Sequence, residues 1–289
     1  MSSLGTSFDF KGLWIPLVTP FRNGAVDHKS LAALVRRVRA DGVSGLVVCG
    51  STGEAAALDK TEQDAVLATV LEAAQGLPVV MGLSGYHLGH TLERVGELNS
   101  QPLAGVLVAA PHYIRPSQAG LQQWFEAIAS ASTHPLIVYD IPYRTGATLE
   151  LATLRALAAH PNICAIKDCG GNTAKTQALL GDGQLQVLAG EDIQIFTTVA
   201  LGGSGAIAAS AHVHTRRFVE LLGLLQKQDL PAARKLWHSL RPLVELSFAE
   251  PNPGPVKALL ALQDEMTAEL RAPMTQASAA LVAQLQRLL

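Results

Sequence analysis

The stretch LIVYDIPYRTGATLELATLRALAAHPNICAIK, residues 136–167, joins two short apolar runs through a segment with helical periodicity. Both runs, 136–140 and 163–167, are almost continuously apolar, which is typical of strands buried on both faces of a parallel sheet. Thr148 is expected to open the intervening helix and Pro161 to end it. The stretch therefore predicts one strand–helix–strand unit.

The same unit recurs along most of the chain. Segments with apolar residues at helical spacing separate the runs, and Asp59 with Glu62 predicts a capping box at the start of one of them. Units of this kind close most economically into a (β/α)8 TIM barrel, an α/β fold. The eight runs predicted as strands are 13–19, 46–49, 78–83, 105–110, 136–140, 163–167, 185–189 and 206–209.

The strand pattern stops after Lys227. Asp229-Leu230-Pro231 is typical of a helix start, and two further helical patterns follow a proline-rich turn at 251–255. We therefore expect residues 1–229 to form the barrel and residues 230–289 to form a C-terminal helical region packed on it.

The charge balance excludes some classes of partner. Among the 289 residues, 22 Lys and Arg oppose 24 Asp and Glu, for a net charge of −2. A cationic surface for nucleic acid or anionic lipid is therefore not expected. Only 16% of residues are charged and 48% are hydrophobic, which indicates that part of the exterior is buried between subunits.

The cysteines and the first residues bear on location. Cys49, Cys164 and Cys169 form neither a metal-ligand spacing nor an even disulfide set, which fits a reducing compartment. Met1 to Gly12 lacks the pattern of a secretory signal, and no stretch of about 18 apolar residues is present to span a bilayer. We expect a cytoplasmic protein.

Lys167 is the candidate nucleophile, because barrel enzymes carry their reactive groups at the carboxyl ends of the strands. Strand alternation would place Ile163, Ala165 and Lys167 on the interior side and Asp168 on the other. An amine kept from water without a carboxylate partner has a lowered pKa and becomes nucleophilic. The alternative is a lysine whose ammonium group reaches solvent or pairs across strands.

Other strand ends offer supporting groups. Tyr139 lies near the end of the preceding run, at the level of Lys167, and could move protons beside an amine, or be an ordinary core tyrosine. The segment Gly50-Ser51-Thr52-Gly53-Glu54 could bind a small carboxylate through backbone N–H groups and hydroxyls, or be a plain turn. Tyr113 lies in a proline-flanked loop.

Histidines and a glycine run raise alternatives that we do not favour. His87 with His90, and His212 with His214, lack the companions of a zinc site, so no metal is expected. The run 202–205 could hold phosphate, but a tight turn is the simpler interpretation.

Four segments together resemble the dihydrodipicolinate synthase / N-acetylneuraminate lyase family of lysine-dependent aldolases. Residues 50–54 are similar to its G-S/T-T-G-E turn, 139–146 to its Y-x-x-P-x-R-T-G segment and 166–168 to its Schiff-base I-K-D/E. Residues 252–257, NPGPVK, are similar to its N-P-x-P-V-K. The matches occur in order over nearly the whole chain.

The resemblance implies that pyruvate forms a Schiff base with Lys167, with no cofactor. It further implies that Tyr139 is the main acid and base and that Ser51 links it to Tyr113 in a proton relay. Tyr113 would come from a neighbouring subunit of a homotetramer, a dimer of dimers. Thr52 with Ser51 would hold the pyruvate carboxylate, while backbone contacts would come from two further positions, Gly190 and Ile207.

Arg144 favours the synthase branch of the family, where an arginine can pair with the carboxylate of aspartate semialdehyde. Departures from that branch are Asp140 in place of asparagine, Ser51 in place of threonine, and the bulky Tyr143. Alternatives are a sister aldolase or dehydratase acting on a sugar acid or a hydroxyproline-derived acid, and a family member that binds metabolites without catalysis. Weak or absent inhibition by lysine is expected, because the family's feedback positions carry Lys60, Gln63, Tyr86, His90 and His112.

Overall fold

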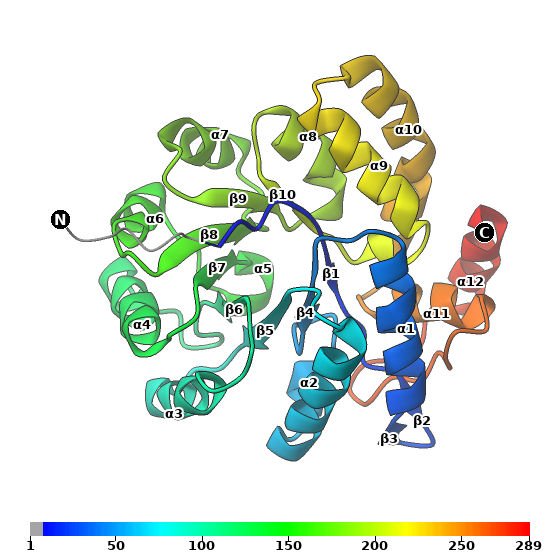
Figure 1. Ribbon diagram of the computed structural model, residues 1–289, viewed down its shortest axis with the longest axis horizontal. Helices are drawn as coiled ribbons and strands as arrows, with labels where there is room; N and C mark the ends of the chain where they lie inside the picture. The colour runs from blue at the N-terminus through cyan, green and yellow to red at the C-terminus, as the bar shows by residue number, and fades with distance from the viewer. Residues whose placement is uncertain (1–7) are drawn as a thin grey trace.

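A closed barrel of parallel strands is the centre of the computed structural model, which describes residues 8–289. Neighbouring strands follow the order β1-β10-β9-β8-β7-β6-β5-β4, and β4 pairs with β1 to close it (Figure 1). All eight predicted strands are present, so the TIM-barrel prediction is confirmed. The barrel strands are β1 Gly12–Pro16, β4 Gly45–Val48, β5 Val79–Leu83, β6 Gly105–Ala109, β7 Leu136–Asp140, β8 Ile163–Asp168, β9 Gln186–Ala189 and β10 Gly205–Ile207.

Helices cover the outside of the barrel (Figure 1). The predicted capping box is confirmed, since the Asp59 side chain accepts from the Glu62 N–H and the Glu62 side chain accepts from the Asp59 N–H. The helices are α1 His28–Ala40, α2 Lys60–Ala74, α3 Leu88–Leu98, α4 Gln118–Ala131, α5 Pro142–Thr145, α6 Leu151–Ala158, α7 Thr173–Asp182, α8 Ile195–Ala200, α9 Thr215–Gln226, α10 Leu230–Ser247, α11 Gly254–Leu262 and α12 Ala279–Leu285, with short 3₁₀ turns η1 Ala55–Ala57, η2 Asp192–Gln194, η3 Ser210–His212 and η4 Gln286–Leu288.

The prediction that Thr148 opens a helix is wrong. Helix α6 begins at Leu151 with Glu150 as its N-cap residue. The physical reason is Leu149, which is fully buried and tied at both backbone groups: its N–H donates to Asp140 Oδ1 at 3.4 Å, and its carbonyl accepts from Lys175 Nζ at 3.0 Å. These contacts fix the chain in a loop up to the N-cap.

Register across β7 and β8 decides which groups meet. Tyr139 is paired with Lys167, and Asp140 with Asp168. The register shifts near the start of β8, where Ile163 faces Leu136 but Ala165 faces Ile137. Ile163 packs in the outer core between strands and helices and Ala165 in the barrel interior, so the predicted alternation is wrong at Ile163. One extra residue in a strand reverses the facing of what precedes it.

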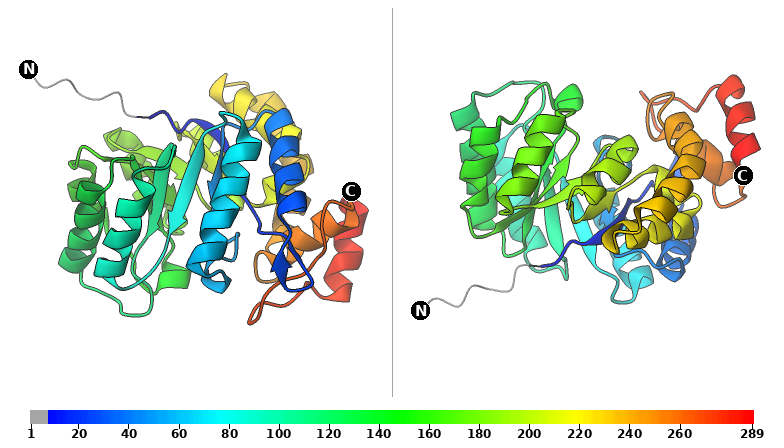
Figure 2. Two further views of the ribbon diagram at one scale, coloured as in Figure 1. Left: turned by 60° about the horizontal axis from the view of Figure 1, so that its bottom comes forward. Right: turned by 90° about the horizontal axis from the view of Figure 1, so that it is seen from above.

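The C-terminal helices pack on one side of the barrel. Helix α10 lies against α8 and α9, and α11 and α12 lie near α1 and the hairpin of β2 Phe21–Arg22 and β3 Ala25–Val26, which the sequence did not predict (Figures 1 and 2). The predicted boundary at residues 229 and 230 falls between α9 and α10, and the division into two regions stays a prediction.

The expectation for the segment Met1 to Gly12 falls mostly on residues 1–7, which lie outside the described residues. In residues 8–289, no helix combines the length and apolar character needed to cross a membrane.

Candidate active site

Lys167 is buried and forms no ion pair with the described acidic residues. Three lysines are buried in the described part of the chain, and Lys175 and Lys257 form ion pairs whereas Lys167 forms none. Burial lowers the pKa of Lys167, an effect opposed mainly by the nearby Cys169 and Asp192. Lys167 Nζ lies 4.4 Å from the centroid of the Tyr139 ring. The geometry therefore favours a neutral amine beside a phenol.

The neighbouring carboxylate points elsewhere, as alternation predicted. Asp168 accepts from the Thr176 hydroxyl at 2.5 Å and from the Gly170 N–H at 2.9 Å. Gly190, directly after β9, leaves room for the Lys167 side chain: a Cβ there would lie 2.8 Å from Lys167 Cγ and 2.4 Å from Cys169 Sγ. Any larger residue would therefore force Lys167 or Cys169 to move.

A small cavity of about 20 Å³ brings most of the predicted site residues together. It joins the ends of strands far apart in the sequence. The predicted residues that line it are Ser51, Thr52, Tyr139, Arg144, Lys167, Gly190 and Ile207. Asp192 and Asn252 also line it, and the sequence assigned them no role.

Tyr113 does not line this cavity. Its side chain is 88% exposed, on a loop where Tyr113 itself has φ of 74°. Ile114 beside it and Tyr86 are also exposed. Within one copy of the chain, Tyr113 is therefore separate from the other predicted residues.

The turn at residues 50–54 is held by long-range contacts. The Thr19 hydroxyl donates to the Gly53 carbonyl at 2.7 Å. Glu54, with φ of 53°, pairs with the fully buried Lys257. Lys257 Nζ also donates to the Glu269 carbonyl at 2.8 Å. Glu54 and Lys257, both quoted in the sequence motifs, thus shape the turn.

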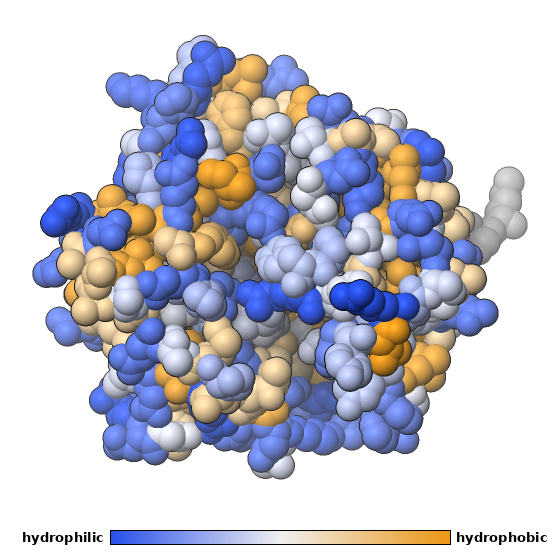
Figure 3. All heavy atoms as spheres, turned by 180° about the vertical axis from the view of Figure 1, so that it is seen from behind, coloured by the Kyte–Doolittle hydropathy of each residue, from blue (hydrophilic) through white to orange (hydrophobic). Residues whose placement is uncertain are grey.

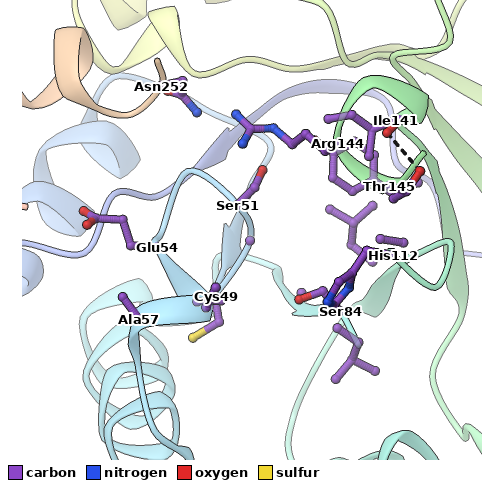
Figure 4. A pocket seen from close by; sticks show the side chains of 18 of the residues that line it. Cys49, Ser51, Glu54, Ala57, Ser84, His112, Ile141, Arg144, Thr145 and Asn252 are labelled. Carbon is purple, nitrogen blue, oxygen red and sulfur yellow. Dashed lines mark hydrogen bonds between the residues drawn. The ribbon is translucent and has the colours of Figure 1, made fainter. Parts of the chain in front are cut away.

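Arg144 stands at the mouth of the site on the single turn α5. In Figure 4 its guanidinium extends toward Ser51 and Asn252. It forms no ion pair with any acidic residue of the range 8–289, and its Cζ lies 5.8 Å from the Tyr143 ring centroid. Arg144 and Tyr139 also line a second cavity of about 350 Å³, with Ser84 and His112 on its other side. Arg144 is thus available for an anionic ligand.

Buried oxygen acids flank the amine. Burial raises the pKa of the Tyr139 phenol well above its usual value, and Ser51 opposes the rise through a hydrogen bond. Burial also raises the pKa of Asp192 to about 6, although Ser210 donates to its Oδ2 from both N–H, at 2.7 Å, and Oγ, at 2.6 Å. Asp192 lies three residues after the end of β9, and this position near a strand end could have identified it from the sequence.

The histidines are engaged in the scaffold. His212 is fully buried, with Nδ1 at 2.8 Å from the Ala209 carbonyl and Nε2 accepting from the Val18 N–H at 3.2 Å. His87 Nδ1 accepts from the His90 N–H and caps α3. No group of three or more potential metal ligands occurs within residues 8–289.

The glycine run before β10 forms a turn. The N–H of Gly202 donates to Val199, that of Gly203 to Thr198 and that of Ser204 to Val187. These N–H groups are therefore not free for a phosphate.

The unusual Asp140 has a specific partner. Its carboxylate, fully buried behind β7, accepts from Lys175 Nζ at 2.5 Å. The side chain thus faces α7 and does not line the cavity.

The outer surface on the side opposite to Figure 1 is mixed, with apolar patches between polar side chains and a hollow near its centre (Figure 3).

Comparison with known proteins agrees with this geometry. The chain matches the model of the dihydrodipicolinate synthetase family over residues 9–289. It is 34% identical to "4-hydroxy-tetrahydrodipicolinate synthase 2" of Clostridium acetobutylicum, over 96% of this chain and 99% of that protein. It is 40% identical to the 4-hydroxy-tetrahydrodipicolinate synthase of Sorangium cellulosum, over 93% of this chain and 91% of that protein. A solved structure of a monomeric dihydrodipicolinate synthase variant aligns with a TM-score of 0.93 at 31% identity, over 96% of this chain and 95% of that one.

Proposed function

The chain belongs to the dihydrodipicolinate synthetase family, whose members are lyases of the Schiff-base aldolase type, and from this premise we propose that it catalyses the 4-hydroxy-tetrahydrodipicolinate synthase reaction. Pyruvate would bind covalently to Lys167, and aspartate semialdehyde would be the second substrate. The observation that carries the proposal is a buried, unpaired amine beside the Tyr139 ring.

The chemistry requires the amine to be neutral at the start. The Lys167 nitrogen attacks the keto carbon of pyruvate, the carbonyl oxygen leaves as water, and a protonated imine forms. This cation withdraws electrons, so the methyl carbon loses a proton and the resulting enamine attacks the aldehyde carbon. Tyr139 would carry protons to and from these atoms, with Ser51 beside it in the same cavity.

The two carboxylates would be held by different groups. The turn containing Ser51 and Thr52 would hold that of pyruvate. The unpaired guanidinium of Arg144 would hold that of aspartate semialdehyde, through charge-assisted hydrogen bonds. Gly190 and Ile207 would contact the bound pyruvate through their backbone groups.

Borohydride reduction in the presence of pyruvate tests the first step. We expect a mass gain corresponding to one reduced pyruvate adduct on Lys167, absent in Lys167→Ala and retained in the control Lys227→Ala, at the end of α9. No gain in the unmodified protein would exclude the enzyme and leave a metabolite-binding protein.

A coupled assay with aspartate semialdehyde tests the second substrate. Arg144→Ala should raise the KM for the aldehyde or lower kcat while trapping of pyruvate persists. Trapping without turnover of aspartate semialdehyde would point instead to a sister aldolase or dehydratase. If Arg144→Ala left turnover of this aldehyde unchanged, the synthase assignment would be abandoned.

The homotetramer is part of the proposal. The exposed Tyr113, Ile114 and Tyr86 support burial of this face against a second copy, which would bring Tyr113 to its neighbour's site. Sedimentation should give a tetramer, and Tyr113→Phe should lower kcat without changing the assembly. An active monomer with an unaffected Tyr113→Phe variant would contradict this part.

A further inference from the structure

Asn252 joins the carboxylate-binding turn to the C-terminal region. It precedes α11, is 7% exposed, and lines both cavities. Figure 4 shows its side chain directed into the pocket near Ser51 and Arg144. The residue is thus buried at the site although nearly 200 positions separate it from the turn.

The side chain of Asn252 forms one hydrogen bond, in which it is the donor. Asn252 Nδ2 donates to Thr52 Oγ1 at 3.0 Å. An amide N–H cannot accept, so Thr52 Oγ1 is the acceptor in this contact. The hydroxyl proton of Thr52 is then not used in this contact, and within residues 8–289 the Thr52 hydroxyl donates no hydrogen bond. Thr52 therefore presents a donor to a ligand.

The other half of the amide is unsatisfied. Asn252 Oδ1 is buried and has no hydrogen-bond partner within the described range. An unpaired buried carbonyl destabilises a fold, and such groups are rare. Rotating the amide would let Oδ1 accept the Thr52 proton, but Thr52 would then offer only lone pairs to the cavity and repel a carboxylate.

We propose that Asn252 is a positioning residue that keeps the Thr52 hydroxyl as a hydrogen-bond donor to the carboxylate of the keto acid bound at Lys167. The inference rests on the proposed function only in that a keto acid must bind at Lys167. It does not depend on which aldehyde is the second substrate.

The test measures the pyruvate concentration that gives half-maximal borohydride trapping. Loss of one such hydrogen bond in Asn252→Ala should raise this concentration about tenfold. The near-isosteric Asn252→Asp should raise it further, because an ionised carboxylate accepts the Thr52 proton and repels the ligand. A purely structural role predicts instead that the trapping concentrations of both variants follow their losses of stability in urea unfolding, because a buried, ionised carboxylate is itself destabilising.

A double variant tests whether Asn252 acts through Thr52. Thr52→Val should raise the half-maximal concentration by itself, and adding Asn252→Ala should change it less than about twofold if Asn252 acts through Thr52. Asn162→Ala is the matched control: this part-buried amide bonds three carbonyls around 129–134, so its loss should lower stability without affecting trapping.

Three results would overturn the inference. They are additive effects of the two changes, an Asn252→Asp variant milder than Asn252→Ala, and unchanged half-maximal trapping in both Asn252 variants. Absence of trapping in the unmodified protein is a separate outcome, because it refutes the proposed function itself. If Asn252→Ala does not fold, Asn252→Asp against Thr52→Val gives the same comparison.

Discussion

Replacing Asp192 with asparagine should stabilise the protein while altering its chemistry. The carboxyl is 2% exposed, and burial raises its pKa from 3.8 to about 6. One pKa unit corresponds to about 1.4 kcal/mol, so keeping the side chain ionised in the folded state at pH 8 costs about 3 kcal/mol. Asparagine fits the same space and cannot ionise, and its carbonyl oxygen can still accept both bonds from Ser210.

The contribution of Asp192 to the free energy of unfolding changes with pH in a defined direction. Because the folded pKa is above the unfolded one, the folded state binds more protons between pH 4 and 6. The contribution of Asp192 to stability is therefore present below pH 4 and lost as the pH rises through 6. Asp192→Asn should exceed the unmodified protein in stability at pH 8 by up to about 3 kcal/mol, and this advantage should disappear near pH 4.

Urea unfolding at pH 8 and pH 4.5, at one protein concentration, measures this difference. The same variant should move the acid limb of pyruvate trapping to lower pH, because the Asp192 anion raises the pKa of Lys167. A variant less stable at pH 8, or a stability difference independent of pH, would show that the carboxylate is not held ionised at a cost.

Other predictions follow from the buried groups. Lys175→Met should lower the free energy of unfolding, measured in urea, by about 3–5 kcal/mol, because it leaves the Asp140 carboxylate unpaired. Adding Asp140→Asn should restore most of this stability, and a larger loss in the double variant than in Lys175→Met would contradict this account. Burial lowers the pKa of His212 from 6.5 to about 4, so the contribution of His212 to the free energy of unfolding should fall by about 3 kcal/mol as the pH drops from 6.5 to 4, opposite in sign to that of Asp192. Relative to the unmodified protein, His212→Gln should therefore gain stability over this pH range, and a pH-independent difference between the two proteins would refute the account. Free lysine should not inhibit turnover in a steady-state assay, and inhibition at micromolar lysine would refute that expectation.

The barrel and the placement of the candidate site could be predicted because they depend on local pattern. Continuous apolar runs identify parallel strands, and the candidate reactive residues lie at the carboxyl ends of several of these runs. This reasoning placed Lys167 beside Tyr139 and Asp168 away from both, as the register shows. It failed at Ile163, because a strand with one extra residue has the same composition as a regular strand.

Long-range partners could not be predicted from pattern. Asp140 appeared as a departure at the end of a strand, and only the fold shows that Lys175, from the first turn of α7, neutralises it. Leu149 bonds to the same two side chains, which delays the start of α6. An apparent anomaly at the site is therefore a packing feature behind the barrel wall.

The turn at 50–54 depends on contacts with α11 and the residues just before it. Asn252 donates to Thr52, and Lys257 pairs with Glu54, so two residues five positions apart hold two members of the turn. A strand end alone would leave Glu54 buried without a counter-charge and Thr52 without a fixed hydroxyl, and both arrangements are unfavourable. The C-terminal segment is therefore a structural part of the turn at 50–54, which explains why barrel periodicity identified the turn but not the residues that orient it.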